Sequence, residues 1–162
     1  MLTTDRVFRA SIVLRVFCMS EKTRILFLCT GNSCRSQMAE GWARYLKPDA
    51  IEAYSAGIET HGMNEHAVRV MGETGVDISG QRSKHVEELF DVGLDYVVTV
   101  CDHANEHCPV FPRRVKHVHV GFDDPPRLAK TAKTEEEALG HYRRVRDEIR
   151  AFVETLPDAL EE

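Results

Sequence analysis

A cysteine separated from an arginine by five residues could form a site that binds and attacks an oxyanion. Cys29 follows the apolar run 25–28, and Arg35 precedes a helical pattern that begins at residue 37. A loop between a strand and a helix points backbone N–H groups and the positive end of the helix dipole at one place, and an arginine adds a planar set of donors. The same positive field favours a thiolate. The sequence therefore predicts a lowered pKa and a nucleophilic role for Cys29.

The residues between and beside these two complete the predicted oxyanion site. Ser36 could donate a hydrogen bond to the sulfur, which would help the thiolate to form and later to leave. Cys34 lies in the same tight curl, and we expect its side chain to face away from the anion because the backbone N–H groups must point inward. The residues predicted to surround the bound anion are Thr30, Gly31, Asn32, Ser33, Cys34 and Arg35.

A second pair of cysteines, Cys101 and Cys108, brackets a short polar segment later in the chain. Two thiols on a mobile segment could approach each other in one state and separate in another, as a disulfide relay requires. His103 and His107 between them leave a zinc site open as an alternative, although the spacing is longer than in most zinc knuckles and no second ligand pair follows. Two unrelated cysteines are the third interpretation.

The elements that must position these residues alternate between strands and helices. The predicted strands cover residues 24–28, 51–56, 95–100 and 115–120, and the predicted helices cover residues 37–46, 64–74, 83–90 and 134–156. Asn64, Ser83 and Thr134 are the expected caps of the last three helices. This order predicts an α/β fold with a single-domain four-stranded parallel sheet, helices on both faces and right-handed crossovers.

Three of the candidate residues follow predicted strands directly or closely. Cys29, Cys101 and Asp124 all come after the carboxyl end of a strand. Ligands bind at this edge in open parallel sheets. We therefore expect these three side chains to meet at one site.

The composition limits the classes of function. The chain has 162 residues, 43% hydrophobic and 29% charged, with a formal net charge of -5. These values suit one globular domain, and an acidic chain without a basic stripe is not expected to bind nucleic acid. Five cysteines in a chain of this size do not make a disulfide scaffold, and their enzyme-like contexts favour a reducing cytoplasm.

Residues 1–21 do not fit the pattern of the rest. The apolar stretch 7–18 is interrupted by Arg9 and Arg15, so it is too short and too charged to span a membrane, and no convincing signal-peptide cleavage site follows. Met19 resembles a natural start. We expect residues 1–21 to be a loosely held extension or an artefact of start-site choice, and residues 22–162 to form the domain.

The loop from Cys29 to Arg35 resembles the Cys-x5-Arg loop of low-molecular-weight tyrosine phosphatases and of the arsenate reductases built on that fold. The longer string CTGNSCRSQMAEGW is similar to the thioredoxin-coupled arsenate reductase branch. This resemblance implies arsenate as substrate and thioredoxin as reductant. It also implies that Cys29 attacks arsenic, that Cys101 is the resolving thiol and that Cys108 completes a surface disulfide. In Gly-Phe-Asp-Asp-Pro, the family's general acid aligns with Asp124; a turn carboxylate that caps the chain is the alternative.

The same family contains members with a potassium site, and this sequence departs from it. Asn32, Glu40 and Ser55 match positions around the cation, but Lys84 stands where those members have aspartate. An ammonium cannot ligate potassium, so we expect Lys84 to take the cation's place and pair with Glu40. We expect no metal and no cofactor, and a monomer. A low-molecular-weight phosphatase that uses Cys29 without the other two thiols, and an oxyanion sensor, are the alternative functions.

Overall fold

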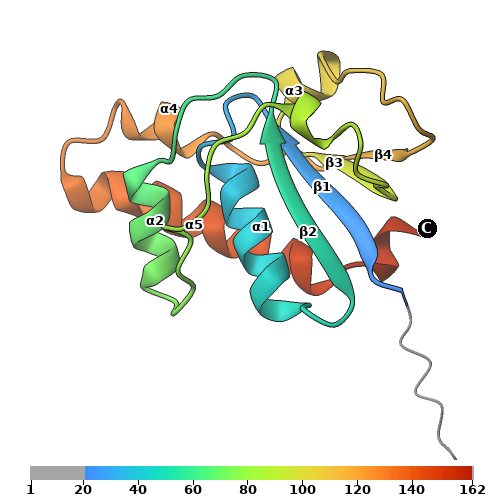
Figure 1. The fold of residues 1–162 in the computed structure, drawn as a ribbon. Helices are drawn as coiled ribbons and strands as arrows, with labels where there is room; N and C mark the ends of the chain where they lie inside the picture. The colour runs from blue at the N-terminus through green and yellow to red at the C-terminus, as the bar shows by residue number, and fades with distance from the viewer. Residues whose placement is uncertain (1–20, 162) are drawn as a thin grey trace, which may run out of the picture.

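The computed structural model describes residues 21–161, and the prediction for residues 1–20 lies outside this range. The four strands are β1 (Thr23–Cys29), β2 (Ile51–Gly57), β3 (Tyr96–Thr99) and β4 (Lys116–His119). They form one parallel sheet in the order β2-β1-β3-β4. The predicted fold class and strand count are confirmed (Figure 1).

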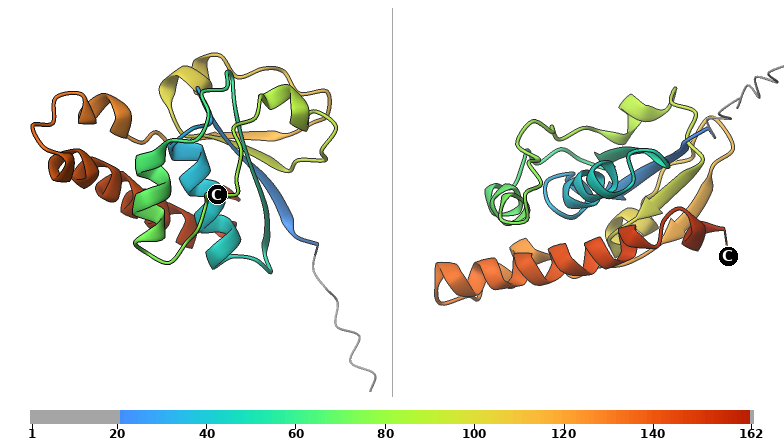
Figure 2. Two further views of the ribbon diagram at one scale, coloured as in Figure 1. Left: turned by 60° about the vertical axis from the view of Figure 1, so that its left-hand side comes forward. Right: turned by 90° about the horizontal axis from the view of Figure 1, so that it is seen from below.

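Helices connect the strands and cover the sheet. They are α1 (Arg35–Leu46), α2 (Glu65–Gly72), α3 (Asp102–Glu106), α4 (Pro125–Ala129) and α5 (Glu135–Glu154), with two 3-10 helices, η1 (Val86–Leu89) and η2 (Asp158–Leu160). The view from below in Figure 2 places α5 along one side of the sheet and η1 on the other. None of these helices within residues 21–161 has the length and apolar character needed to cross a membrane.

The core lies between the sheet and the pair α1 and α5. The last five residues of β1 and all of β3 are buried, as expected for central strands of a parallel sheet. Trp42 of α1 is buried, and its indole nitrogen donates a hydrogen bond to the carbonyl of Arg146 on α5, 3.2 Å away. These contacts fix α1, and therefore the loop that precedes it, against the end of β1.

Two of the predicted helix caps are confirmed and one is wrong. Asn64 and Thr134 accept hydrogen bonds from the first turns of α2 and α5. Ser83 does not cap a helix, because its hydroxyl donates to the carbonyl of Gly31 at 2.9 Å. His85 caps the short η1 instead. The segment 83–90 thus serves the loop after β1 and has only one 3-10 turn.

The segment between the two later cysteines also differs from the prediction. Residues 102–106 of the segment that was predicted to be polar and mobile form the helix α3, with Cys101 at its N-cap and His107 at its C-cap. The helix α4, which begins at Pro125, was not predicted either. Figure 1 shows α3 near the edge of the sheet to which β1 and β2 point.

Candidate active site

The loop from Cys29 to Cys34 turns its peptide carbonyls outward. Every carbonyl from residue 29 to residue 33 accepts a hydrogen bond from outside the loop. Segment 58–64 supplies four of these donors, and the Gln37 amide supplies the donor to Asn32 at 2.9 Å. Because an N–H points away from the carbonyl of the same peptide group, the N–H groups of the loop are held toward its interior. The loop therefore has the geometry that the prediction of an anion cradle requires.

Two glycines let segment 58–64 lie this close to the loop. A Cβ atom on Gly31 would lie 2.2 Å from Nδ1 of His61, and a Cβ atom on Gly57 would lie 2.7 Å from the carbonyl oxygen of Thr30. The contact at Gly57 would force the two chain segments apart, and the contact at Gly31 would displace the His61 side chain. This supporting segment was not identified from the sequence. Its only sequence signal is Gly57, which follows the predicted strand 51–56.

Asn32 adopts a backbone conformation that non-glycine residues use rarely. Its φ of 46° lies in the left-handed region, which asparagine tolerates better than most residues. The side chain is buried and held at both ends: its oxygen accepts from the Lys84 N–H at 2.8 Å, and its nitrogen donates to the Ser36 hydroxyl at 2.9 Å. These bonds stabilise the curl in the shape that an anion needs.

The Cys29 sulfur lies inside this curl. It lies 2.7 Å from the Ser36 hydroxyl, and the Asn32 N–H donates to it at 3.2 Å. The predicted lowering of its pKa is wrong: burial raises the pKa of the Cys29 thiol, while Ser36 and the charge of Arg35 act in the opposite direction. The sequence indicated the groups that stabilise the thiolate but not the extent to which the sulfur is buried.

Removing the Ser36 hydroxyl should make Cys29 less reactive. In the Ser36→Ala variant the thiolate loses a hydrogen bond that lowers its pKa, so the pKa rises further. The thiolate fraction increases with pH, so the midpoint of Cys29 alkylation should move to higher pH. At pH 7 the alkylation rate should fall by about tenfold, which corresponds to one hydrogen bond to a charged group.

Iodoacetamide labelling followed by peptide mass spectrometry over a pH series would measure this change. Ser79→Ala, at an exposed serine remote in sequence from the loop, is the matched control and should keep the wild-type profile. An unchanged midpoint in Ser36→Ala would contradict the assigned role of the hydroxyl.

Arg35 connects the loop to the predicted general acid. One of its nitrogens donates to the carbonyl of Phe122 at 3.0 Å, and another lies 3.4 Å from Oδ1 of Asp124. The Asp124 side chain makes no capping hydrogen bond to α4, so the alternative of a purely capping carboxylate is not favoured. Asp123 points elsewhere and pairs with Arg144 at 2.9 Å. The cavity beside these groups, about 330 Å³, is lined by Arg35, Asp102, Gly121, Phe122, Asp123, Asp124 and Arg127.

Of the other cysteines in residues 21–161, Cys101 lies at the loop and Cys108 does not. The Cys101 sulfur is 3.4 Å from the Thr30 hydroxyl, because β3 lies next to β1 and both residues follow these strands. The half-buried Cys108 follows α3, and its sulfur lies 3.6 Å from Nδ1 of His117 on β4. The structure thus brings Cys29, Cys101 and Asp124 to one edge of the sheet, with Cys108 beyond α3.

Cys34 is buried at the N-cap of α1, and burial raises the pKa of its thiol. No group of three histidine, cysteine or acidic side chains in residues 21–161 is placed to hold a metal ion. For this part of the chain the zinc alternative therefore has no structural support: Cys101 contacts Thr30, whereas Cys108 contacts His117.

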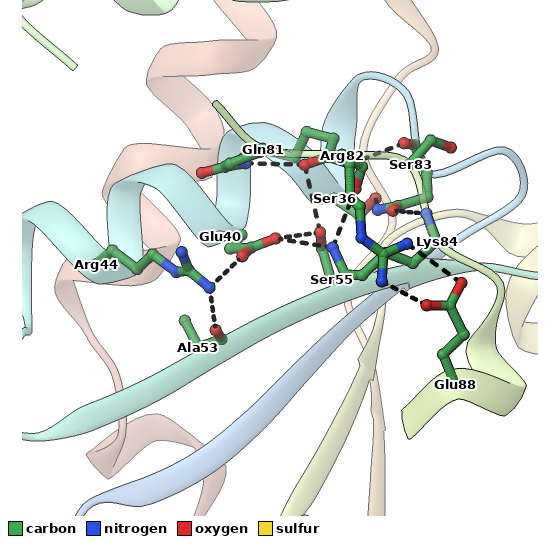
Figure 3. Close-up of polar contacts among 12 residues, drawn as sticks. Ser36, Glu40, Arg44, Ala53, Ser55, Gln81, Arg82, Ser83, Lys84 and Glu88 are labelled. Carbon is green, nitrogen blue, oxygen red and sulfur yellow. Dashed lines mark hydrogen bonds and ion pairs between the residues drawn. The ribbon is translucent and has the colours of Figure 1, made fainter. Parts of the chain in front are cut away.

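The buried carboxylate of Glu40 lies behind the loop, between two cations (Figure 3). Its oxygens are 2.6 Å from the Arg44 guanidinium and 3.6 Å from the Lys84 ammonium, and the Ser55 hydroxyl donates to it. Burial lowers the pKa of Lys84, whereas Glu40 acts to raise it. Lys84 also holds Asn32 through its backbone N–H, so this cluster is directly connected to the loop from Cys29 to Cys34.

Comparisons with known proteins agree on one family. The family model described as low molecular weight phosphotyrosine protein phosphatase matches residues 24–162. A protein of Bacillus licheniformis named arsenate reductase is 52% identical over 141 residues, which cover 85% of this chain and 99% of that protein. The crystal structure of arsenate reductase from Archaeoglobus fulgidus is 30% identical with a TM-score of 0.64, covering 82% of this chain and 97% of that one. The crystal structure of low molecular weight protein tyrosine phosphatase from T. tengcongensis is 27% identical with a TM-score of 0.67, covering 85% of this chain and 99% of that one.

Proposed function

This chain belongs to the low molecular weight phosphotyrosine protein phosphatase family, and from that premise we propose that it reduces arsenate to arsenite through a relay of three thiols. The observation that carries the proposal is the position of Cys101. Its sulfur lies at the edge of the anion loop, beside Thr30, where a phosphatase reaction would need no second thiol. Relatives with 52% and 50% identity are named arsenate reductases.

Substrate binding uses the inward N–H groups of the loop and the guanidinium of Arg35. An acidic chain repels an anion at long range, so binding depends on these local donors. The loop is held in shape by segment 58–64 and by Asn32, so little reorganisation accompanies binding. The bound arsenate then lies next to the Cys29 sulfur.

In the first chemical step the Cys29 sulfur bonds to arsenic, and an arsenate oxygen leaves as water. Asp124 supplies a proton to the leaving oxygen, and the proton lost by the Cys29 thiol balances the step. Ser36 stabilises the sulfur while it is anionic, which matters because burial raises the Cys29 pKa. Arg35, which follows the loop directly, contacts Asp124 and the Phe122 carbonyl and so holds the acid close to the loop.

In the second step Cys101 attacks the sulfur of Cys29. A Cys29–Cys101 disulfide forms, the sulfur–arsenic bond breaks, and its electron pair stays on arsenic, which leaves as arsenite. Cys108 then attacks Cys101 and frees Cys29, and thioredoxin reduces the resulting Cys101–Cys108 disulfide. Since thiols must stay reduced for this cycle, a reducing cytoplasm is the compartment that suits it.

The test is arsenate-dependent NADPH consumption with thioredoxin and thioredoxin reductase, with arsenite release measured in parallel. Steady consumption matched by arsenite supports the proposal. Failure to release arsenite, with both reductase components active, would refute it and would favour the alternative of an oxyanion sensor that binds the anion without turnover.

Phosphate-ester hydrolysis is the second candidate, because the matching family model describes phosphotyrosine phosphatases. Phosphate and arsenate share shape and charge, so the same loop, Cys29 and Asp124 could hydrolyse an ester slowly. We propose this as a side activity of the same site.

The cluster behind the loop predicts insensitivity to potassium. Because the Lys84 ammonium already lies 3.6 Å from Glu40, the midpoint of thermal unfolding should be the same in potassium and in sodium chloride. The Lys84→Asp variant places a second carboxylate beside the buried Glu40. Its free energy of unfolding should fall by about 3 kcal/mol in sodium chloride, and potassium should recover part of that loss.

Thermal unfolding in matched salts measures this difference. Lys130→Asp makes the same charge change at an exposed position and is the control. Strong stabilisation of the wild-type protein by potassium over sodium would count against the role given to Lys84.

A further inference from the structure

The edge strand β4 carries two histidines that contact the segment between Cys101 and Cys108 at its two ends. His117 and His119 are two positions apart, so they extend from the same face of the strand. Nδ1 of His117 lies 3.6 Å from the Cys108 sulfur. Nε2 of His119 lies 3.1 Å from Oδ1 of Asp102, the first residue of α3. The segment is therefore attached to β4 at both ends.

A third contact joins the middle of α3 to His119 through Thr99. The hydroxyl of Thr99, at the end of β3, lies 2.9 Å from Nδ1 of His119 and donates to the side-chain oxygen of Asn105 at 3.2 Å. Thr99 is 2% exposed, whereas Asn105 and His119 are exposed, so these hydrogen bonds are partly shielded from solvent. His119 and Thr99 together hold both Asp102 and Asn105.

The helix needs these attachments because it is too short to be stable alone. It has five residues, and isolated helices shorter than about 12 residues are marginal in water. Ala104 is its one buried side chain. Side-chain contacts with β3 and β4 therefore contribute much of what keeps α3 folded.

The folded helix keeps the two later cysteines apart. Cys101 caps its beginning and Cys108 follows its end, and a helix rises about 1.5 Å per residue. A disulfide requires Cα atoms within about 7 Å of each other, so Cys108 can reach Cys101 only after this segment unwinds. The attachments to β4 oppose that movement.

We propose that His117 and His119 are positioning residues of the disulfide relay: they hold α3 folded and thereby set the rate at which Cys108 reaches Cys101. This inference rests on the proposed function. The step is an internal exchange in which the Cys108 thiolate bonds to the Cys101 sulfur and the Cys29–Cys101 bond breaks. Cys29 leaves as a thiolate and takes up one proton in place of the proton that Cys108 gave up, so no external oxidant or reductant takes part.

The test is a single turnover with arsenate and no reductant. The reaction is quenched with acid at set times, and peptide mass spectrometry measures the Cys29–Cys101 and Cys101–Cys108 disulfides. In His117→Ala, His119→Ala and Asp102→Ala, conversion of the first disulfide into the second should be about threefold faster than in wild type, as expected when one exposed or weak hydrogen bond is lost. Asp102 is exposed, so its variant tests the attachment even if His119→Ala folds poorly.

Two further measurements separate positioning from a general structural role. His119→Gln keeps an amide nitrogen near the position of Nε2, so its conversion rate should lie between those of His119→Ala and wild type. In the reduced proteins, hydrogen exchange at the Asn105 and His107 amides, which bond within α3, should be faster in His119→Ala than in wild type. His141→Ala, on α5, is the control and should match wild type in both measurements.

The outcomes distinguish the two hypotheses. If wild-type protein forms no Cys101–Cys108 disulfide, the proposed relay fails and this inference fails with it. If the disulfide forms but at an unchanged or slower rate in the alanine variants, the relay stands and the role of the histidines is overturned.

Discussion

Replacing Cys101 with serine is expected to abolish arsenate reduction while leaving phosphate-ester hydrolysis intact. The variant can still bind the anion and attack it with Cys29, because the loop amides, Arg35 and Asp124 are unchanged. It cannot form a disulfide with Cys29, so the electron pair of the sulfur–arsenic bond is not left on arsenic. Arsenite release should fall by more than about a thousandfold, as expected when a nucleophile is removed, and the hydrolysis rate should stay within about threefold of wild type.

Arsenite release and p-nitrophenyl phosphate hydrolysis, measured on the same preparations, make this comparison. A serine hydroxyl can keep the contact with Thr30, so the loop should retain its shape. Cys29→Ser is the matched control, because it should lose both activities. Equal loss of both activities in Cys101→Ser would show that this residue shapes the site rather than passing electrons.

The sequence was sufficient to predict the fold and the position of the loop that carries Cys29, Arg35 and Ser36. The apolar runs of β1 and β3 are central strands, and the alternation of strands and helices leaves only a parallel sheet as a simple solution. Cys29, Arg35 and Ser36 lie within eight residues of one another, so the turn from β1 to α1 places them in one loop, which other segments then hold in shape. Local patterns of this kind can be interpreted without knowing the tertiary structure.

Properties that depend on distant residues could not be predicted. The Cys29 pKa is set mainly by burial, and burial depends on how the loop packs with segment 58–64 and the neighbouring strand. The helix α3 has a weak local signal, because it has only five residues and several of its side-chain contacts are to residues on other strands, such as His119 and Thr99. Ser83 shows the same effect: its sequence context resembles a helix cap, but its hydroxyl bonds to the loop at Gly31.

Replacing Cys108 with serine is expected to permit one turnover and then stop the enzyme. Cys29 and Cys101 remain, so each protein molecule can release one arsenite and form the Cys29–Cys101 disulfide. That disulfide should persist because residues 29 and 101 are only 4% and 5% exposed, so a protein reductant has little access to their sulfurs. In the proposed relay, wild type avoids this arrest because the half-buried Cys108 would take over the disulfide from Cys29.

Quantifying arsenite per enzyme in the presence of thioredoxin and its reductase tests this expectation. Cys108→Ser should give a burst close to one equivalent followed by a steady rate more than about a hundredfold below wild type, because the step that returns Cys29 to its thiol form is missing. Mass spectrometry of the arrested protein should find the Cys29–Cys101 disulfide, and Cys29→Ser should give no burst. Several turnovers by Cys108→Ser with thioredoxin alone would refute the three-thiol relay, because they would require the reductant to reach a disulfide that the folded protein buries.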